Sequence, residues 1–253
     1  MEIIYLDKYF VVVNKPSGLL VHRSEIDRHE TRFALQMVRD MIGQRVYPVH
    51  RLDKPTSGVL LFALSPDDAT AMMHLFASGS VKKRYLAVVR GYTPECGNID
   101  YALKEQLDRM TDRKVRKDKP AQSALTLYQR LATVELPHAV GRYPTSRYSL
   151  LEVTPKTGRK HQIRRHMKHI FHPLVGDTTH GDGKHNQFFR AQFECHRLLL
   201  SAVSLSFDHP LTGEKTTLNA PLDESFTRVM MRLGWEEKVM VENDKQPPPA
   251  FSQ

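Results

Sequence analysis

The chain has 253 residues, of which 40% are hydrophobic and 26% charged, a composition typical of soluble globular proteins and not of fibrous or disordered chains. Lysine and arginine number 37 against 28 acidic residues, and the net charge of +9 favours a polyanionic partner bound through its phosphates. Because there is no run of about eighteen apolar residues and no signal-peptide pattern at the start, we expect no membrane span and no leader. Cys96 and Cys195 form no CxxC pair, so we expect free thiols in a reducing cytoplasm.

The first third of the chain predicts short strands interspersed with two helices. The second helix has the clearest signals, because Ser65 can cap it, Pro66 suits its first turn and Gly79 suits its end. In chain order we expect two strands within 3–16, a helix over 31–43, a strand over 58–65, a helix over 65–79 and a strand over 83–91.

The remaining chain begins with a polar, highly charged stretch over 100–121, which we expect to be an exposed excursion. We then expect antiparallel strands over 123–135 and 146–155, a basic helix over 158–170, a buried strand over 196–207 and a helix over 223–235. Residues 236–253 include three prolines and few apolar anchors, so we expect one domain over 1–235 and a loosely held tail. Strands and helices do not alternate strictly, which favours an α+β fold over a doubly wound parallel sheet.

Histidines are numerous around the basic helix and raise the question of a metal site. His166 and His169 have a permissible spacing for zinc, but no glutamate lies between them and no third ligand is evident. We therefore expect no metal, and we expect these histidines to face RNA or solvent. The motifs GxxxxGK[ST], GxGxxG and GxSxG are absent, which argues against a phosphate-binding loop, a dinucleotide fold and a serine hydrolase.

The segment HRLDKPTSG, residues 50–58, contains the leading candidate for chemistry. Asp53 stands at the entrance of a buried strand, where an aspartate is either a turn-former or a reactive carboxylate. The loops KPSG and KPTSG leave strand edges, which are places where functional sites are built. Tyr85 follows three cations at a strand entry, and Arg164 lies on the basic helix. Together these residues indicate an acid-dependent site that handles a nucleotide without a cofactor.

Several blocks of the sequence resemble the motifs of the ribosomal large subunit pseudouridine synthase A family. In chain order they are NKPSGLLVH, HRLDKPTSGVLLFALS, KKRYLAVVRG, TPKTGRKHQIRRH, HPLVGD and RLLLSA. They keep the family's order from about residue 3 to 220, and the combination of HRLDxxTSG with TGRxHQIRxH is highly specific. The chain departs from the family at Ser201, where a histidine is common, and no S4-type RNA-binding module is evident before the catalytic region.

The resemblance implies a pseudouridine synthase fold, in which a mixed, largely antiparallel central sheet with flanking helices surrounds a catalytic cleft. It also implies that the N1–C1′ bond of a uridine in RNA is broken and the uracil rejoined through C5, without metal, nucleotide or redox cofactor. The resemblance is greatest to bacterial members that modify uridine 65 of tRNA, in the acceptor and T-stem region. We therefore expect a cytoplasmic, monomeric enzyme that acts on tRNA, with no protein partner and no membrane contact.

The same resemblance assigns roles to individual residues. Asp53 matches the catalytic aspartate, which must be ionised, and Arg164 matches the arginine that pairs with it. Tyr85 matches the tyrosine that stacks on the uracil, and Arg51 matches a position that can fill the space of the flipped base. The charged stretch over 104–119 is a candidate for target recognition. Candidate RNA contacts are His50, Lys82, Lys83, Arg159, Lys160 and Arg165.

One alternative is a pseudouridine synthase that acts on ribosomal RNA. Two further alternatives belong to other functional classes. The first is an RNA-binding protein or chaperone without chemistry, in which Asp53 is only a turn residue. The second is an N-glycosidase that releases the base, and its products distinguish it from an isomerase. The residues alone indicate a basic α+β domain with an acid-dependent site on RNA.

Overall fold

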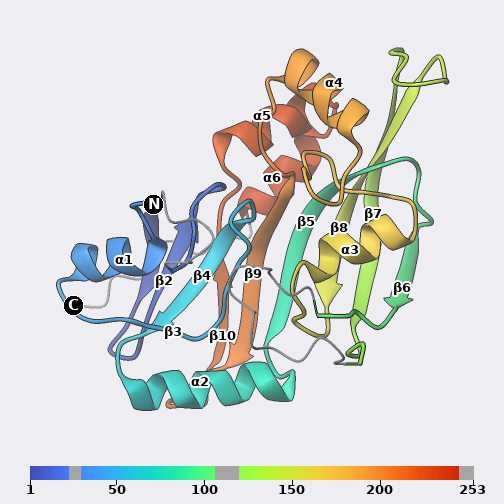
Figure 1. Ribbon diagram of the computed structural model, residues 1–253. Helices are drawn as coiled ribbons and strands as arrows, with labels where there is room; N and C mark the ends of the chain where they lie inside the picture. Colours follow the sequence, from blue (N-terminus) through green and yellow to red (C-terminus); the bar gives the residue numbers. More distant parts are fainter. Residues whose placement is uncertain (23–29, 106–119, 245–253) are drawn as a thin grey trace.

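One large sheet organises the molecule (Figure 1). The computed structural model describes residues 1–22, 30–105 and 120–244, and within them ten strands form this sheet. The strands are β1 (Glu2–Leu6), β2 (Phe10–Lys15), β3 (Tyr47–Pro48), β4 (Ser57–Ala63), β5 (Lys82–Arg90), β6 (Cys96–Asp100), β7 (Leu125–Leu136), β8 (Ser146–Pro155), β9 (Leu200–Asp208) and β10 (Lys215–Asn219). Their order is β1-β2-β4-β9-β5-β8-β7-β6, with β10 paired to β9 and β3 to β4.

Helices cover both faces of the sheet (Figure 1). In the described ranges they are α1 (Ala34–Ile42), α2 (Pro66–Ser78), α3 (Gln162–His169), α4 (Gly183–Phe193), α5 (Glu224–Arg232) and α6 (Glu236–Asp244). None of these helices is both long enough and apolar enough to cross a membrane.

Neighbouring residues of a strand face different helices, as the two-residue period of a strand requires. In β2, Val11 packs in a cluster with α1, whereas Val12 packs in a cluster with α2. In β5, Ala87 packs with α3, whereas Val88 packs with α4, α5 and α6. Tyr85 packs against both the α1 cluster and the α3 cluster, so these two helices share one face of the sheet.

Among the described strands, one pair is parallel and the others are antiparallel. The parallel pair is β4 and β9, with Ser57 opposite Ser201 and Gly58 opposite Ala202. This short pairing joins the β1-β2-β4 part of the sheet to the part that runs from β9 to β6. The expected α+β class with a mixed, largely antiparallel sheet is therefore confirmed.

The expected strands and helices are present, and the structure adds several elements that the pattern did not predict. The main one is α4, whose sequence GKHNQFFRAQF is mostly polar and lacks a clear apolar stripe. Asp182 caps it by accepting hydrogen bonds from the backbone nitrogens of Lys184 and His185. The other additions are β3, β6, β10 and α6.

The C-terminal segment differs from the loosely held tail that we expected from residue 236. Its first part, Glu236–Asp244, forms α6. Trp235 and Val239 are only 4% and 7% exposed in the cluster that includes α5, so apolar side chains anchor this helix. The rest of the tail, 245–253, lies outside the described residues, and so does 106–119, the main part of the charged stretch considered for target recognition.

The backbones of the parallel pair meet at Gly58. Its φ is +109°, a conformation that glycine adopts readily and other residues do not. A Cβ at this position would overlap the backbone carbonyl of Ala202 in β9. The missing side chain therefore lets β4 lie directly against β9, immediately after the loop that carries Asp53.

We expect Gly58→Ala to lower the free energy of unfolding by about 3 kcal/mol or more, because the new methyl group must push β4 from β9 and hold an unfavourable φ. Urea denaturation measures this change. The matched control is Gly183→Ala, since a Cβ there meets nothing within 4 Å. The control should leave stability unchanged or raise it by up to about 1 kcal/mol. Equal stability of Gly58→Ala and wild type would contradict this account of the parallel pair.

Candidate active site

Asp53 lies in the loop between β3 and β4, and its backbone, not its side chain, forms the turn there. The carbonyl oxygen of Asp53 accepts a hydrogen bond from Thr56 N at 3.0 Å. The carboxylate is 19% exposed and has Arg164 and His161 as its neighbours. Asp53 can therefore be both a turn residue and a reactive carboxylate, because its backbone makes the turn and leaves the carboxylate available for chemistry.

Arg164 binds two carboxylates at once from helix α3. Its Nη1 donates to Asp53 Oδ2 at 3.2 Å, while Nε and Nη2 donate to the two oxygens of Asp177 at 2.7 and 2.8 Å. Only 4% of the Arg164 side chain is exposed, and that of Asp177 is fully buried. The paired contact to Asp177 fixes the plane of the guanidinium and so aims the remaining nitrogen at Asp53.

The charges of Arg164 and Asp177 stabilise each other. Burial by itself raises the pKa of Asp177, but hydrogen bonds from Arg164, His180 N and Thr179 N outweigh it and hold the pKa below its usual value. Burial likewise disfavours the charged form of Arg164, and the two carboxylates raise its pKa above the ordinary value nonetheless. Arg164 thus remains a cation in an almost water-free setting, where its attraction to Asp53 is little screened.

Two hollows meet at Asp53. The first has a volume of about 730 Å³ and is lined by Tyr85, by Phe76 at the end of α2 and by residues 155–164. The second has a volume of about 960 Å³ and is lined by residues of the 17–22 loop, by Gly176, Thr178 and Thr179, and by the region before β9. The residues that line both are Arg51, Leu52, Asp53, Gly158, Arg159, Lys160, His161 and Arg164. A space of this size accommodates a nucleotide, with Asp53 at the boundary.

Tyr85 and Arg51 both lie beside Asp53. Tyr85 projects from β5 into the first hollow. Burial and the negative charge of Asp53 raise the pKa of Tyr85, so its phenol stays neutral and can pack against a base. Arg51 is exposed and lines both hollows, a position from which it can reach bound RNA. The structure thus brings together all four residues that the sequence singled out for the site.

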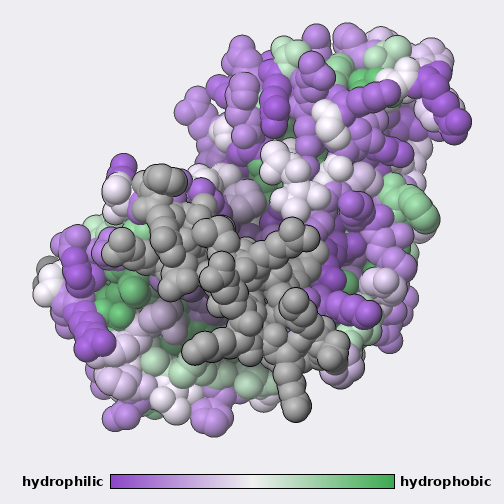
Figure 2. All heavy atoms as spheres, in the orientation of Figure 1, coloured by the Kyte–Doolittle hydropathy of each residue, from purple (hydrophilic) through white to green (hydrophobic). Residues whose placement is uncertain are grey.

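The lysine and arginine candidates for RNA contacts surround the same region. Lys83 lines the first hollow, Arg165 lines the second, and Arg159 and Lys160 line both. Lys82 is exposed at the start of β5, outside both linings. Figure 2 shows hydrophilic side chains predominating over α3 on this face of the molecule. These cations can therefore meet the phosphates of an RNA whose nucleotide enters the first hollow.

His50 differs from the other candidates because it is held as a neutral ring. Its Nε2 accepts a hydrogen bond from Leu61 N at 3.0 Å, and the ring stacks on Phe76 with centroids 4.7 Å apart. Burial and, to a lesser degree, the charge of Lys83 lower the pKa of His50 to about 3. His50 therefore shapes the wall of the first hollow and brings no positive charge to a phosphate.

Lys15 is a buried residue of the KPSG loop whose role the sequence did not indicate. Its ammonium donates to the carbonyl oxygens of Pro16, Leu19 and Lys54 at 2.9, 2.8 and 3.2 Å. Burial and, secondarily, the charge of Arg197 lower the pKa of Lys15 to about 7. Because Lys54 directly follows Asp53, Lys15 ties the KPSG loop to the loop that carries the carboxylate.

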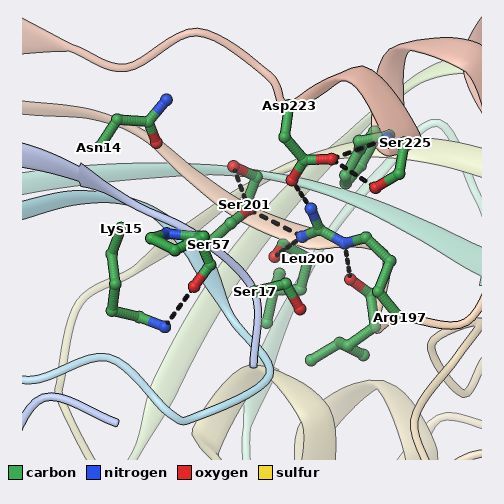
Figure 3. A network of polar contacts seen from close by, with 12 residues as sticks. Asn14, Lys15, Ser17, Ser57, Arg197, Leu200, Ser201, Asp223 and Ser225 are labelled. Atoms are coloured by element: carbon green, nitrogen blue, oxygen red, sulfur yellow. Dashed lines mark hydrogen bonds and ion pairs between the residues drawn. The ribbon is translucent and has the colours of Figure 1, made fainter. Parts of the chain in front are cut away.

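A further group of polar contacts fixes the start of β4 (Figure 3). Arg197 donates from Nη2 to Ser57 Oγ at 2.7 Å and forms an ion pair through Nη1 with Asp223, the residue that caps α5. Ser57 Oγ also contacts Ser201 Oγ at 3.0 Å. Ser201, the unusual residue of the RLLLSA block, therefore links β9 to β4 through a buried hydroxyl.

The histidines of α3 differ in part from our expectation that they face RNA or solvent. His166 is fully buried, and its Nε2 lies 3.0 Å from the carbonyl oxygen of Tyr101, so it supports the fold. His169 is exposed and stacks on the Tyr101 ring. In the part of the chain that the structure describes, no three side chains of His, Cys, Asp or Glu are grouped to hold a metal ion.

Comparisons with known proteins cover nearly the whole chain. Residues 9–169 match the family model described as RNA pseudouridylate synthase. The chain is 53% identical over 240 residues to tRNA pseudouridine synthase C of Vibrio parahaemolyticus, which covers 95% of this chain and 98% of that protein. It is 52% identical over 236 residues to tRNA pseudouridine synthase C of Haemophilus influenzae, 93% of this chain and 99% of the relative. Among solved structures, human RNA pseudouridylate synthase domain containing 4 is similar with a TM-score of 0.69 and 27% identity over 92% of both chains.

We expect Asp177→Asn to lower the free energy of unfolding by about 3 kcal/mol at neutral pH, because a buried cation loses its ionised partner. Since folding depresses the pKa of Asp177, its contribution is present above the unfolded carboxyl pKa and is lost as pH falls through the folded value. Urea denaturation of both proteins between pH 7 and pH 3 should show their stabilities converging below about pH 4.

The control for this variant is Asp40→Asn, which removes an exposed partner of Arg39 and should change stability by less than about 0.5 kcal/mol. A difference between wild type and Asp177→Asn that stays constant down to pH 3 would contradict the assignment of an ionised Asp177.

Proposed function

The chain belongs to the RNA pseudouridylate synthase family and isomerises uridine in RNA, and we propose that its substrate is tRNA and its catalytic carboxylate Asp53. We choose Asp53 as the catalytic carboxylate because of the residues that surround it. A single carboxylate, bound by the buried Arg164, stands at the boundary of two hollows that are ringed by cations. This setting orients the Asp53 carboxylate toward a nucleotide that has left its stack.

The proposal of tRNA rests on the relatives. Two of them are named tRNA pseudouridine synthase C, and each aligns with this chain over at least 93% of both lengths. Within tRNA we propose uridine 65, in the acceptor and T-stem region, as the target, because the motif blocks resemble the members that modify it. In such a helical stem the enzyme must recognise the shape and the backbone of RNA, which suits a surface of lysines and arginines.

The reaction conserves the atoms of the substrate. The N1–C1′ bond breaks, the uracil turns, and a C5–C1′ bond forms; the proton at C5 is then released, and N1 takes up a proton. Arg164 Nη1 donates to Asp53 Oδ2 and so orients the carboxylate, whether Asp53 attacks C1′ or acts on the ribose by another route. The flipped base lies in the first hollow, where the neutral ring of Tyr85 can stack on it.

The surroundings of the site supply RNA binding. We propose that Arg51 enters the space that the flipped base leaves, since it is exposed beside Asp53. Lys83, Arg159, Lys160 and Arg165 contact the neighbouring phosphates, and Lys82 extends this surface along β5. We further propose that the protein acts as a monomer in the cytoplasm, where tRNA is found, and that its single domain includes α6.

Asp53→Asn and Asp53→Ala should reduce turnover on tRNA by about 10⁴-fold or more, because the reacting carboxylate is gone. Tritium placed at C5 of uridine measures this, since each turnover releases it to water. We expect wild type to release tritium from tRNA and not from ribosomal RNA transcripts. Both variants should bind tRNA at least as tightly as wild type, because loss of a negative charge favours phosphate binding.

The control is Asp208→Asn, an exposed aspartate at the end of β9 that should leave turnover unchanged. Undiminished tritium release by Asp53→Ala would refute the catalytic role of Asp53. Release from ribosomal RNA alone would move the substrate to that class of RNA, and free uracil in the products would indicate an N-glycosidase.

Arg164→Lys should lower the single-turnover rate by about 100-fold or more while changing the dissociation constant for tRNA by less than about 3-fold. A lysine keeps the charge, but it cannot bind Asp53 and Asp177 through one rigid fork. Single-turnover kinetics and a tRNA binding titration separate the two quantities, with the exposed Arg39→Lys as control. Equal losses in rate and affinity would identify Arg164 as a phosphate contact.

A further inference from the structure

A pair of histidines, His161 and His180, adjoins the carboxylate of Asp53. His161 Nε2 lies 3.9 Å from Asp53 Oδ2, and His161 Nδ1 lies 3.0 Å from His180 Nε2. The two rings meet edge to face, with centroids 5.2 Å apart. His161 lines both hollows, so this pair is part of the wall around the reacting nucleotide.

The backbone holds both histidines in place. His161 precedes α3 with φ of 56°, an unusual conformation for a residue with a side chain. The backbone nitrogen of His180 donates to Asp177 Oδ1 at 2.9 Å. Asp177 therefore positions Arg164 directly and also positions His180, which in turn contacts His161.

The carboxylate selects the tautomer of His161. One ring nitrogen of the pair must donate to the other across 3.0 Å. If His161 donated from Nδ1, its Nε2 lone pair would face the negative Asp53 Oδ2. If His161 instead accepts from His180 Nε2–H, its own Nε2–H points toward Asp53. Electrostatics favours the second arrangement, because it places a positive hydrogen beside a carboxylate.

The charged groups around the pair keep His161 neutral. Burial lowers the pKa of His161 to about 4, and the cations Arg164 and Lys160 act in the same direction, against the opposing effect of Asp53. His180 faces Asp177, Arg164, Lys168 and Arg165, and burial lowers its pKa too. At neutral pH the pair therefore offers a hydrogen-bond donor to Asp53 without adding a charge.

Arg164 and His161 both lie nearest to the same oxygen of Asp53. Arg164 Nη1 lies 3.2 Å from Oδ2 and His161 Nε2 lies 3.9 Å from it. Within the described residues, no hydrogen bond reaches Asp53 Oδ1. A contact of 3.9 Å is longer than a hydrogen bond, and distances of this kind shorten when substrate completes a site.

We propose that His161, in the Nε2–H tautomer that Asp53 favours and a hydrogen bond from His180 supports, is a positioning residue that fixes Asp53 Oδ2 together with Arg164 and so presents Oδ1 as the oxygen that meets the nucleotide. This inference rests on the proposed catalytic role of Asp53 and adds which atom reacts and what aims it. Two donors on one oxygen restrict rotation of the carboxylate about its last bond, which a single contact to Arg164 does not.

The tautomer is tested directly by nitrogen-15 NMR of the full-length protein at pH 7. Spectra that correlate ring nitrogens with carbon-bound ring protons distinguish the two neutral tautomers from the imidazolium. The His161 signals are assigned by their loss in His161→Gln. We expect a neutral His161 with the proton on Nε2. A proton on Nδ1, or a charged ring, would overturn the proposal whatever the activity.

The positioning role is tested by comparing His161→Gln with His161→Met. Both side chains carry the same backbone strain at φ of 56°, but only glutamine can place an N–H where imidazole has Nε2. Single-turnover tritium release should fall by about 10- to 100-fold in His161→Met and by less than about 5-fold in His161→Gln. The dissociation constant for tRNA should stay within about 2-fold in both, since neither changes the charge. Equal rates in the two variants would overturn the proposal.

Two further variants complete the design. His180→Phe keeps the ring contact but removes the donor, so it should lower the rate in the same sense as His161→Met and release His161 from its single tautomer. The control is His138→Gln, an exposed histidine outside both hollows, which should behave as wild type. Undiminished activity in Asp53→Asn would refute the proposed catalytic role of Asp53, on which this inference rests. An inactive Asp53→Asn beside a fully active His161→Met would refute only the role of His161.

Discussion

The ion pairs of Arg164 with Asp53 and Asp177 are the contacts on which the active site depends. A buried guanidinium is costly unless its donors are matched, and here three of its nitrogens meet carboxylate oxygens. Asp177 is wholly buried and supplies most of that match, which leaves one nitrogen for the partly exposed Asp53. The buried Asp177 and Asp53, the proposed catalytic carboxylate, thus share one cation.

The environment of Asp53 is built from several separate parts of the chain. Lys15 ties its loop to the preceding one, and Arg197 joins the following strand to β9 and α5. Each support is a buried basic side chain that binds backbone carbonyls, hydroxyls or a carboxylate. Burial lowers the pKa of Arg197 only to about 10, so Arg197 stays charged at neutral pH, whereas burial lowers the pKa of Lys15 to about 7. The charge of Arg197 adds to that of the exposed lysines and arginines, which favours a polyanionic substrate.

The sequence allowed the fold class and the central residues to be predicted, for distinct physical reasons. Strand and helix periods identified the elements that bury continuous apolar faces, whereas the polar α4 needed the hydrophobic core to define it. Asp53 and Arg164 were found because their motifs are specific. Asp177 was not predicted as a site residue, although it is the last residue of the block HPLVGD. Its contact with Arg164 arises only when the loop after α3 folds back onto the helix. His50 looked like an RNA contact because a sequence does not show that its ring is neutral and bonded to the backbone.

The parallel pairing of β4 with β9 has a consequence for how activity arises during folding. The two parts of the sheet that this pairing joins contribute different residues to the site. Asp53 precedes β4 in the first part, while Tyr85 and Arg164 belong to the part that begins at β9. A folding intermediate in which each part has formed but β4 has not docked would display basic residues that attract RNA, yet its carboxylate would lack the arginine. Because Asp53 and Arg164 lie on opposite sides of this pairing, their contact requires that β4 has docked on β9 as well as that each part has folded.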